Sequence, residues 1–270
     1  MIKNSNVIVT GGAGFIGSHL VDRLLKDGAE KVIIIDSLEY GSEENVDRND
    51  KRIVLLKFKI GSDNLRDIES YFHGCDYLFH LAAQKHNQSI ENPHEVYNTN
   101  IVGTSDLFEL AGACKVKKVV FTSSLYAYGS TQLPPMRETD MPNPHTVYGI
   151  SKLTGEHLLS FFAHKAGFEY AILRYFFIYG PKQFARMGYK SVIVKNFERM
   201  IKDMQPTIFG DGEQSLDYVY VDDAVEATVK ALEPKVSGEI INVGSGTAVR
   251  VIDLVEQMID VAGKKSGILY

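Results

Sequence analysis

Residues 7–17 of the chain read VIVTGGAGFIG, and this stretch decides the fold. Its first three residues are β-branched and apolar, as expected of a buried strand. Glycines follow at positions 11, 12, 14 and 17, in the overlapping spacings G-x-x-G-x-x-G and G-x-G-x-x-G. Glycine is needed where the backbone turns sharply and where a phosphate must approach bare N–H groups. A helix that begins near Gly14 would direct its positive N-terminal end at such a phosphate.

A second apolar strand, residues 32–35, ends at Asp36, which follows Gly17 by 19 residues. An acidic residue at about this distance accepts hydrogen bonds from the ribose hydroxyls of a bound dinucleotide. Its charge would repel a phosphate on the 2′ oxygen, so the sequence predicts a site for NAD rather than NADP. The alternatives are an ordinary tight turn at the glycines and an unrelated carboxylate at the end of a strand.

Strand-like and helix-like segments alternate through the first two thirds of the chain. We predict strands at 6–10, 31–36, 52–60, 77–83, 118–124 and 171–179. Helical patterns lie between several of them, at 14–27, 94–113 and 146–165. Apolar strands that alternate with helices predict an α/β fold with a doubly wound, Rossmann-like parallel sheet that is covered on both faces.

The rhythm changes after Gly180. We predict a helix at 190–204, short strands at 206–209 and 217–221, a helix at 222–232, a strand at 239–243 and a last helix at 250–262. The sequence therefore predicts two units. Residues 1–180 would form the dinucleotide-binding domain and residues 181–270 a smaller C-terminal lobe that binds the substrate, with 222–245 as a candidate addition to the main sheet.

Composition narrows the choice of partners. The net charge of −5 argues against nucleic acid as the main partner. No apolar run approaches the ~20 residues that span a bilayer, and the first strand starts too early for a signal peptide, so we expect no membrane partner. Cys75 and Cys114 match no metal or redox spacing, so we predict no metal site and a reducing, cytoplasmic location.

A candidate catalytic pair lies in HTVYGISKLTGEHLL, where Tyr148 and Lys152 are four residues apart and would share one helix face. A phenol has a pKa near ~10, and a neighbouring ammonium would favour the phenolate, so Tyr148 could act as a general acid and base. Upstream, the strand KVVFTSS ends in Thr122, Ser123 and Ser124, at the edge of the sheet where ligands bind. A serine there could hold the substrate oxygen whose proton Tyr148 removes. The alternative is a partly exposed tyrosine beside a surface lysine.

Together these motifs resemble the extended short-chain dehydrogenase/reductases, the group of NAD-dependent sugar-nucleotide epimerases and dehydratases. The resemblance runs from the N-terminus to about residue 262. It is carried by TGGAGFIG, HLAAQ at 80–84, NTNIVGT around Asn100, Tyr128-Gly129, LRYF at 173–176 and FGDGEQSLDYVYVDDA at 209–224, in the order of the family.

The resemblance implies a set of site residues. Ser124, Tyr148 and Lys152 would be catalytic. The residues that would contact NAD are Gly11, Gly14, Phe15, Ile16, Gly17, Asp36, Leu81, Ala82, Ala83, Lys85, Asn100, Thr122, Tyr148, Lys152 and Phe176. The residues that would contact the substrate are Ser124, Phe177, Arg186 and Phe209.

Several positions depart from the family pattern. Leu125 and Tyr126 follow Ser124, where members that eliminate water usually carry Asp-Glu, so we do not expect 4,6-dehydration. Lys59 stands where the third strand usually ends in an Asp that meets the adenine. The run KHNQSIENP after HLAAQ is a residue short. Phe177 replaces an Asn that often touches the substrate.

The largest departure from the family pattern concerns the arginines that bind a diphosphate. Leu216 replaces an arginine that commonly holds this group, and a second such arginine would lie beyond Tyr270. We expect other cations to substitute, because Arg–phosphate pairs are strong and bidentate. The candidates are Lys182, Arg186, Lys190 and Arg250, of which Arg186 is favoured.

The leading function is therefore an NAD-dependent epimerase of a nucleoside-diphosphate sugar, acting at C4 through a 4-keto intermediate. An NAD-dependent ketoreductase or dehydrogenase is the alternative, and a non-catalytic NAD sensor is a third reading. The helices at 94–113 and 146–165 resemble those of a four-helix dimer interface in the family, which predicts a homodimer, although their apolar faces could equally belong to the core. The sequence identifies neither the sugar nor the nucleotide.

Overall fold

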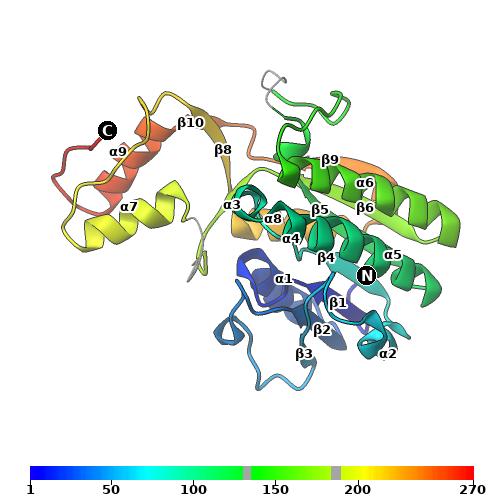
Figure 1. The fold of residues 1–270 in the computed structure, drawn as a ribbon. Coiled ribbons are helices and arrows are strands. Elements are labelled where there is room, and N and C mark those ends of the chain that lie inside the picture. Colours follow the sequence, from blue (N-terminus) through cyan, green and yellow to red (C-terminus); the bar gives the residue numbers. More distant parts are fainter. Residues whose placement is uncertain (130–134, 184–189) are drawn as a thin grey trace.

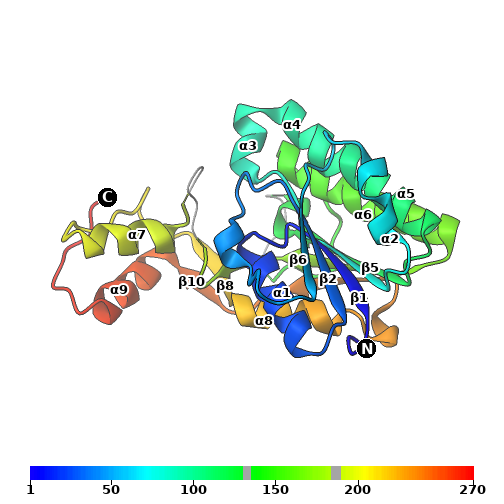
Figure 2. The ribbon, with the colours of Figure 1, turned by 90° about the horizontal axis from the view of Figure 1, so that it is seen from below.

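The structure, a computed structural model, describes residues 1–129, 135–183 and 190–270. Its centre is a seven-stranded sheet in the order β3-β2-β1-β4-β5-β6-β9, and every neighbouring pair is parallel (Figures 1 and 2). The predicted doubly wound sheet is confirmed. The strands are β1 (Asn6–Thr10), β2 (Lys31–Asp36), β3 (Ile53–Lys57), β4 (Tyr77–His80), β5 (Lys118–Ser124), β6 (Glu169–Tyr175) and β9 (Glu239–Val243).

Helices cover both faces of this sheet, as Figure 2 shows from below. One layer holds α1 (Phe15–Lys26) and α8 (Val221–Lys230), which pack against each other. The other layer holds α2 (Glu69–Phe72), α5 (Thr104–Ala113) and α6 (Val147–Ala166). The short helices α3 (His86–Glu91) and α4 (Pro93–Tyr97) lie between α2 and α5 in the chain.

Successive side chains of each strand point to opposite faces of the main sheet, so each face has its own hydrophobic core. Val7 and Val9 of β1 pack with Leu20 of α1, whereas Ile8 between them packs with Phe108 of α5. All five side chains are fully buried. Successive residues of a strand point to opposite faces, so a strand covered on both sides must be apolar throughout. This explains the near-continuous apolar run at the start of the chain.

The smaller lobe stands beside the carboxyl ends of the main strands (Figure 1). It contains a three-stranded sheet, β10-β8-β7, and two helices that contact each other. Its elements are β7 (Phe177–Tyr179), α7 (Val192–Ile201), β8 (Ser215–Tyr220), β10 (Ala248–Arg250) and α9 (Val251–Val261). Met200, Val255 and Met258 form the centre of its own small core.

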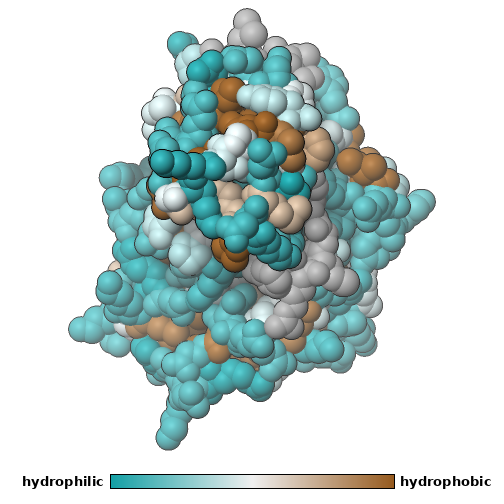
Figure 3. Space-filling model, turned by 90° about the vertical axis from the view of Figure 1, so that its left-hand side faces the viewer, coloured by the Kyte–Doolittle hydropathy of each residue, from teal (hydrophilic) through white to brown (hydrophobic). Residues whose placement is uncertain are grey.

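Figure 3 looks onto this lobe and shows hydrophobic patches within a mostly hydrophilic surface. Exposed apolar side chains of the lobe include Ile201, Met204 and Val261. Among the described residues, no helix is both long enough and apolar enough to span a membrane.

Three predicted elements differ from the structure. The strand expected at 171–179 is two strands, because Phe176 separates β6 of the main sheet from β7 of the small sheet. The helix expected at 94–113 is interrupted by a π-helical segment at Asn98–Gly103. The strand expected at 206–209 is reduced to one bridge between Thr207 and Leu269.

Residues 222–245 lie on the main sheet rather than on the smaller lobe. Helix α8 packs on α1, and β9 pairs with β6 from Ala171–Glu239 to Tyr175–Val243. The chain therefore crosses from the main sheet to the lobe and back again before it ends in α9. A boundary at residue 180 divides the sequence but not the sheet.

Candidate active site

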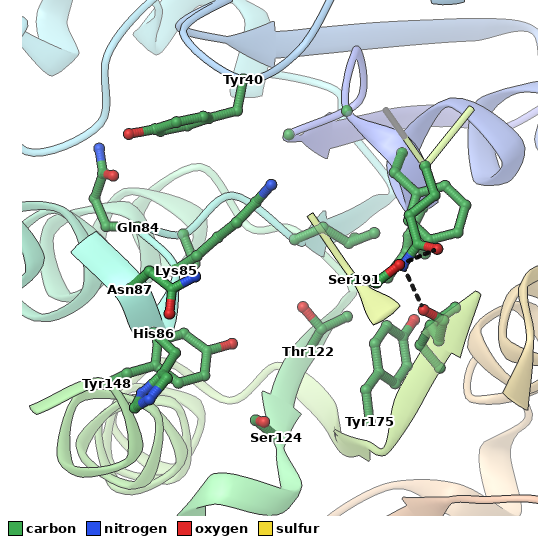
Figure 4. A pocket seen from close by; sticks show the side chains of 18 of the residues that line it. Tyr40, Gln84, Lys85, His86, Asn87, Thr122, Ser124, Tyr148, Tyr175 and Ser191 are labelled. Carbon is green, nitrogen blue, oxygen red and sulfur yellow. Dashed lines mark hydrogen bonds between the residues drawn. The ribbon is translucent and has the colours of Figure 1, made fainter. Parts of the chain in front are cut away.

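A cavity of about 960 Å³ lies along the carboxyl ends of the main strands and extends into the smaller lobe. Figure 4 shows part of its lining, with Tyr40 and Gln84 at one end and Ser124, Tyr148 and Tyr175 at the other. Most of the predicted site residues line it. They are Gly11, Gly14, Phe15, Ile16, Gly17, Asp36, Leu81, Ala82, Ala83, Lys85, Thr122, Ser124, Tyr148, Lys152, Phe176, Phe177 and Phe209.

Among the described residues, one predicted site residue, Asn100, does not line this cavity. Asn100 is buried behind it, where its amide bonds both backbone groups of Gln84 and the hydroxyl of Ser151. Asn100 therefore ties the loop after β4 to helix α6, and its contact with the cofactor stays a prediction. Arg186 lies outside the described residues.

The glycine loop has the shape that a dinucleotide phosphate requires. Gly11 has a φ of +71°, which L side chains rarely adopt. A Cβ on Gly17 would lie 2.1 Å from the carbonyl oxygen of Gly11, and a Cβ on Gly11 would lie 2.9 Å from the backbone nitrogen of Ala82. The loop is thus a close-packed backbone cradle at the start of α1, and it fits the pyrophosphate of NAD.

Asp36 ends β2 on the wall of the same cavity. Its two carboxylate oxygens accept hydrogen bonds from the backbone N–H groups of Ala13, at 3.0 Å, and Leu38, at 2.8 Å. Burial raises the pKa of this carboxyl group, while both hydrogen bonds lower it. A carboxylate has about four acceptor positions, so two remain for the hydroxyls of a ribose.

The candidate catalytic residues meet at the other end of the cavity. Thr146 caps α6 by accepting a hydrogen bond from the backbone N–H of Gly149, which fixes Tyr148 in the first turn. The Tyr148 hydroxyl faces Ser124 at the end of β5, and Figure 4 shows it turned toward that strand. One helical turn later, Lys152 donates a hydrogen bond of 2.7 Å to the carbonyl oxygen of Thr122.

Burial controls the protonation of this pair. It raises the pKa of Tyr148 to about 12, against the opposing effect of the Ser124 hydrogen bond. It lowers the pKa of Lys152 to about 7, against the attraction of Glu156. The lysine ammonium was expected to favour the phenolate, but desolvation outweighs it here, so Tyr148 is a neutral phenol at neutral pH.

Two further rings surround the phenol. The ring of His86 stacks on that of Tyr126, with centroids 4.7 Å apart, and the edge of Tyr126 meets Tyr148 at 5.7 Å. Both residues line the cavity. Neither residue was expected at the site from the sequence. The signal was present in the short run that begins at Lys85, and in the replacement of the usual Asp-Glu by Leu125 and Tyr126.

A buried ion pair supports the site from behind. Arg174 of β6 donates to both carboxylate oxygens of Glu156 at 2.9 and 2.7 Å, and the Ser123 hydroxyl donates to Glu156 at 2.5 Å. The ring of Tyr128 covers the guanidinium, with 4.5 Å between the Arg174 Cζ and the ring centroid. Glu156 follows Lys152 by one turn of α6, which is the only trace of this support in the sequence.

The structure also shows which of the cations proposed to bind a diphosphate line the cavity, and which carboxylates they pair with. Lys182 pairs with Asp22 at 3.0 Å, and Arg250 pairs with Glu213 and Asp253. Neither lines the cavity, so the structure lends neither of them support as the diphosphate cation. Lys190 does line it and pairs with Glu198 at 2.6 Å.

At the far end of the cavity, Lys59 occupies the place expected for an adenine-contacting Asp. Its ammonium lies between the carboxylates of Glu39, at 2.7 Å, and Glu95, at 2.5 Å. These two partners raise the pKa of Lys59, so its charge is fixed and already neutralised.

Comparison with known proteins agrees with this geometry. The model of the NAD dependent epimerase/dehydratase family matches residues 7–244. A putative UDP-glucose 4-epimerase of Methanocaldococcus jannaschii is 38% identical over 250 residues, which cover 92% of this chain and 79% of that protein.

Solved structures give the same result. The UDP-glucose 4-epimerase of Thermotoga maritima, solved with UDP-glucose, has a TM-score of 0.91 at 38% identity. The match covers 98% of this chain and 85% of the Thermotoga chain. The UDP-glucose 4-epimerase of Thermus thermophilus, solved with NAD, has a TM-score of 0.87 at 33% identity, with coverage of 97% and 85%. The resemblance inferred from the motifs is confirmed: this chain is an enzyme of the NAD-dependent epimerase/dehydratase family.

Proposed function

We propose that this protein inverts C4 of a UDP-sugar through a 4-keto intermediate, with NAD as its resident cofactor. The observation that carries the proposal is that Tyr148 and Ser124 face each other, with Lys152 one turn away, inside a cavity that also contains the glycine loop. Two of the similar proteins described above are named as UDP-glucose 4-epimerases with known structures, one with UDP-glucose bound and one with NAD.

The residues divide the work as follows. The glycine loop holds the pyrophosphate of NAD, and Asp36 holds the adenosine ribose. NAD supplies the hydride acceptor and donor of the reaction. Ser124 holds the C4 oxygen of the sugar while Tyr148, in its phenolate form, removes the proton, and the phenol so formed returns it once the flat keto sugar has turned over. In the ligand-free protein Tyr148 is a neutral phenol, so the phenolate would need the positive ring of bound oxidised NAD together with the ammonium of Lys152.

The neighbours of Ser124 favour epimerisation over elimination. Loss of water from the sugar needs a second acid and base beside the keto sugar. Leu125 and Tyr126 follow Ser124 and both line the cavity, but neither offers a carboxylate. The phenol therefore serves one proton transfer that runs in both directions, which is the requirement of an epimerase.

A substrate panel tests this proposal. Purified protein is incubated with UDP-glucose, UDP-N-acetylglucosamine, UDP-glucuronate and the matching dTDP- and GDP-sugars, and the C4 epimers are resolved by chromatography. We expect conversion of at least one UDP-sugar to its C4 epimer without net formation of NADH. Stoichiometric NADH would instead establish the dehydrogenase alternative, and NAD binding without turnover of any sugar would favour the sensor.

We also propose a homodimer formed by the outer faces of the helical stretches 94–113 and 146–165. Val102 of the π-helical segment before α5 and Ile150 and Phe161 of α6 are about half exposed, at 51%, 45% and 59%. Such exposure leaves apolar surface for a second copy. Sedimentation should give twice the monomer mass, and Phe161→Glu should reduce it to the monomer.

The two free, buried cysteines support the cytoplasm as the proposed location.

A further inference from the structure

The substrate end of the cavity contains a cation that sequence reasoning did not select. Lys195 lies in the second turn of α7 and lines the cavity. Its ammonium sits over the ring of Phe209, 4.1 Å from the centroid. Phe209 also lines the cavity and is 68% exposed, so this pair faces open space rather than the core.

Lys195 differs from the other lysines of this wall by its partners and its place. Lys59 pairs with two carboxylates, Lys190 pairs with Glu198, and Lys152 donates to a backbone carbonyl at the catalytic end. Lys85 also lies over an aromatic ring, that of Tyr40 at 5.2 Å, but this pair belongs to the cofactor end of the cavity. Among residues 1–129, 135–183 and 190–270, no carboxylate forms an ion pair with Lys195. A cation on an aromatic face keeps its N–H donors available, because the ring supplies no hydrogen-bond acceptor of carboxylate strength.

The same wall lacks the expected arginine. Leu216 of β8 lines the cavity, so an arginine there would extend into it, but leucine offers no hydrogen-bond donor. A diphosphate carries charge that needs compensation inside a partly dry cleft. Lys195 offers that compensation from helix α7.

We propose that Lys195 is the cation that binds the diphosphate of the nucleotide sugar, in place of the arginine lost at Leu216. This inference rests on the proposed function and adds the residue that recognises the charged part of the substrate. In the ligand-free protein the ring of Phe209 holds the ammonium at the cavity wall, and the diphosphate then draws it away as a stronger partner.

A series of ligands with an increasing number of phosphates tests this role. Binding of uridine, UMP and UDP to the NAD-loaded protein is measured by calorimetry for wild type and Lys195→Met. We expect Lys195→Met to weaken UDP binding about 10- to 100-fold, as for the loss of a charged hydrogen bond, and to leave uridine binding within twofold. Lys195→Arg keeps the charge and should bind UDP within a few-fold of wild type.

Lys202→Met is the matched control, because Lys202 is exposed at the end of the same helix and does not line the cavity. It should change none of the three affinities. Equal loss of uridine and UDP binding in Lys195→Met would overturn the inference and assign the lysine to the support of Phe209. Unchanged UDP binding would overturn it outright. Absence of UDP binding to wild type would instead refute the proposed function.

Discussion

The two halves of the cavity are built from different materials. The cofactor half is made largely of backbone, since Gly11, Gly17 and Ala82 approach so closely that an added Cβ on either glycine would overlap the chain. The substrate half is made of side chains from the smaller lobe, including Phe177, Lys195 and Phe209. A backbone cradle accepts one ligand shape, whereas a wall of side chains can change by single substitutions. Two departures that concern substrate contact, Phe177 and Leu216, fall in the second half.

The junction of the halves should show the largest effect. Tyr148→Phe removes the proton acceptor and keeps the ring that packs against Tyr126. Turnover should fall about 10²–10⁴-fold, the usual contribution of a general acid and base, while NAD and UDP binding stay within a few-fold. Steady-state rates and calorimetry check this. Tyr40→Phe, at the opposite end of the cavity, should keep a normal rate; near-normal turnover by Tyr148→Phe would remove the phenol from the mechanism.

The second-largest effect is expected in the cofactor half, where adding one methyl group should weaken NAD binding. Gly17→Ala places a Cβ 2.1 Å from the Gly11 carbonyl oxygen, so the loop must move. We expect NAD affinity to fall about 100-fold and the free energy of unfolding to drop by about 1–3 kcal/mol. UDP binding should persist, which would show that the halves are separable.

Gly74→Ala is the control for that substitution. Gly74 also has a positive φ, of +77°, but its Cβ would meet no atom within 4 Å. It should cost about 1 kcal/mol from backbone strain alone and leave NAD affinity unchanged. Similar NAD affinities for the two variants would contradict the cradle.

Cofactor choice gives a smaller effect at the edge of the same half. Asp36→Ala removes the acceptor of the Ala13 and Leu38 N–H groups and the charge that would repel a 2′-phosphate. NAD affinity should fall about 10-fold, while NADP affinity should change little, so the preference relaxes. Fluorescence titration with both cofactors measures it. A wild type that binds NADP as tightly as NAD would show that Asp36 does not discriminate.

The last effect concerns pH and the buried lysine between the halves. Lys152 has a folded-state pKa of about 7, below its ordinary value of 10.5. Between these values the unfolded chain holds a proton that the folded chain has released, so stability should rise with pH from about 7 to 10.5. Urea unfolding from pH 7 to 9 should show a gain of about 2 kcal/mol over Lys152→Met. Equal pH slopes would contradict the assignment.

The sequence predicted the parts of this molecule that local pattern controls. The glycine loop, strand β2 with Asp36, and helix α6 with Tyr148 and Lys152 each depend on residues close in the chain. The continuous strand at 171–179 was wrong because the exchange between sheets at Phe176 is decided by distant partners in β8 and β9. The helix break at Asn98–Gly103 likewise lies where Gly103 packs against Gly61, a contact that no local pattern records.

The same limit applies to the site. The contacts of His86 with Tyr126, of Glu156 with Arg174 and of Lys195 with Phe209 join different elements, and side-chain identity alone does not pair them. In the sequence, Lys195 does not differ from any other polar residue of a predicted helix. Its position on the cavity wall follows from how α7 packs on α9 and faces β8, which is a property of the folded lobe.

The Glu156–Arg174 pair also constrains how this sequence can change over time. Both side chains are almost fully buried, and loss of either one leaves an uncompensated charge, at a cost of about 3–5 kcal/mol. That is a large share of the ~5–15 kcal/mol by which a typical domain is stable. Two apolar residues could replace the pair together, but each single step passes through an unstable protein. Selection on folding alone should therefore hold these two positions fixed, so their persistence in descendants of this chain would not by itself indicate a role in catalysis.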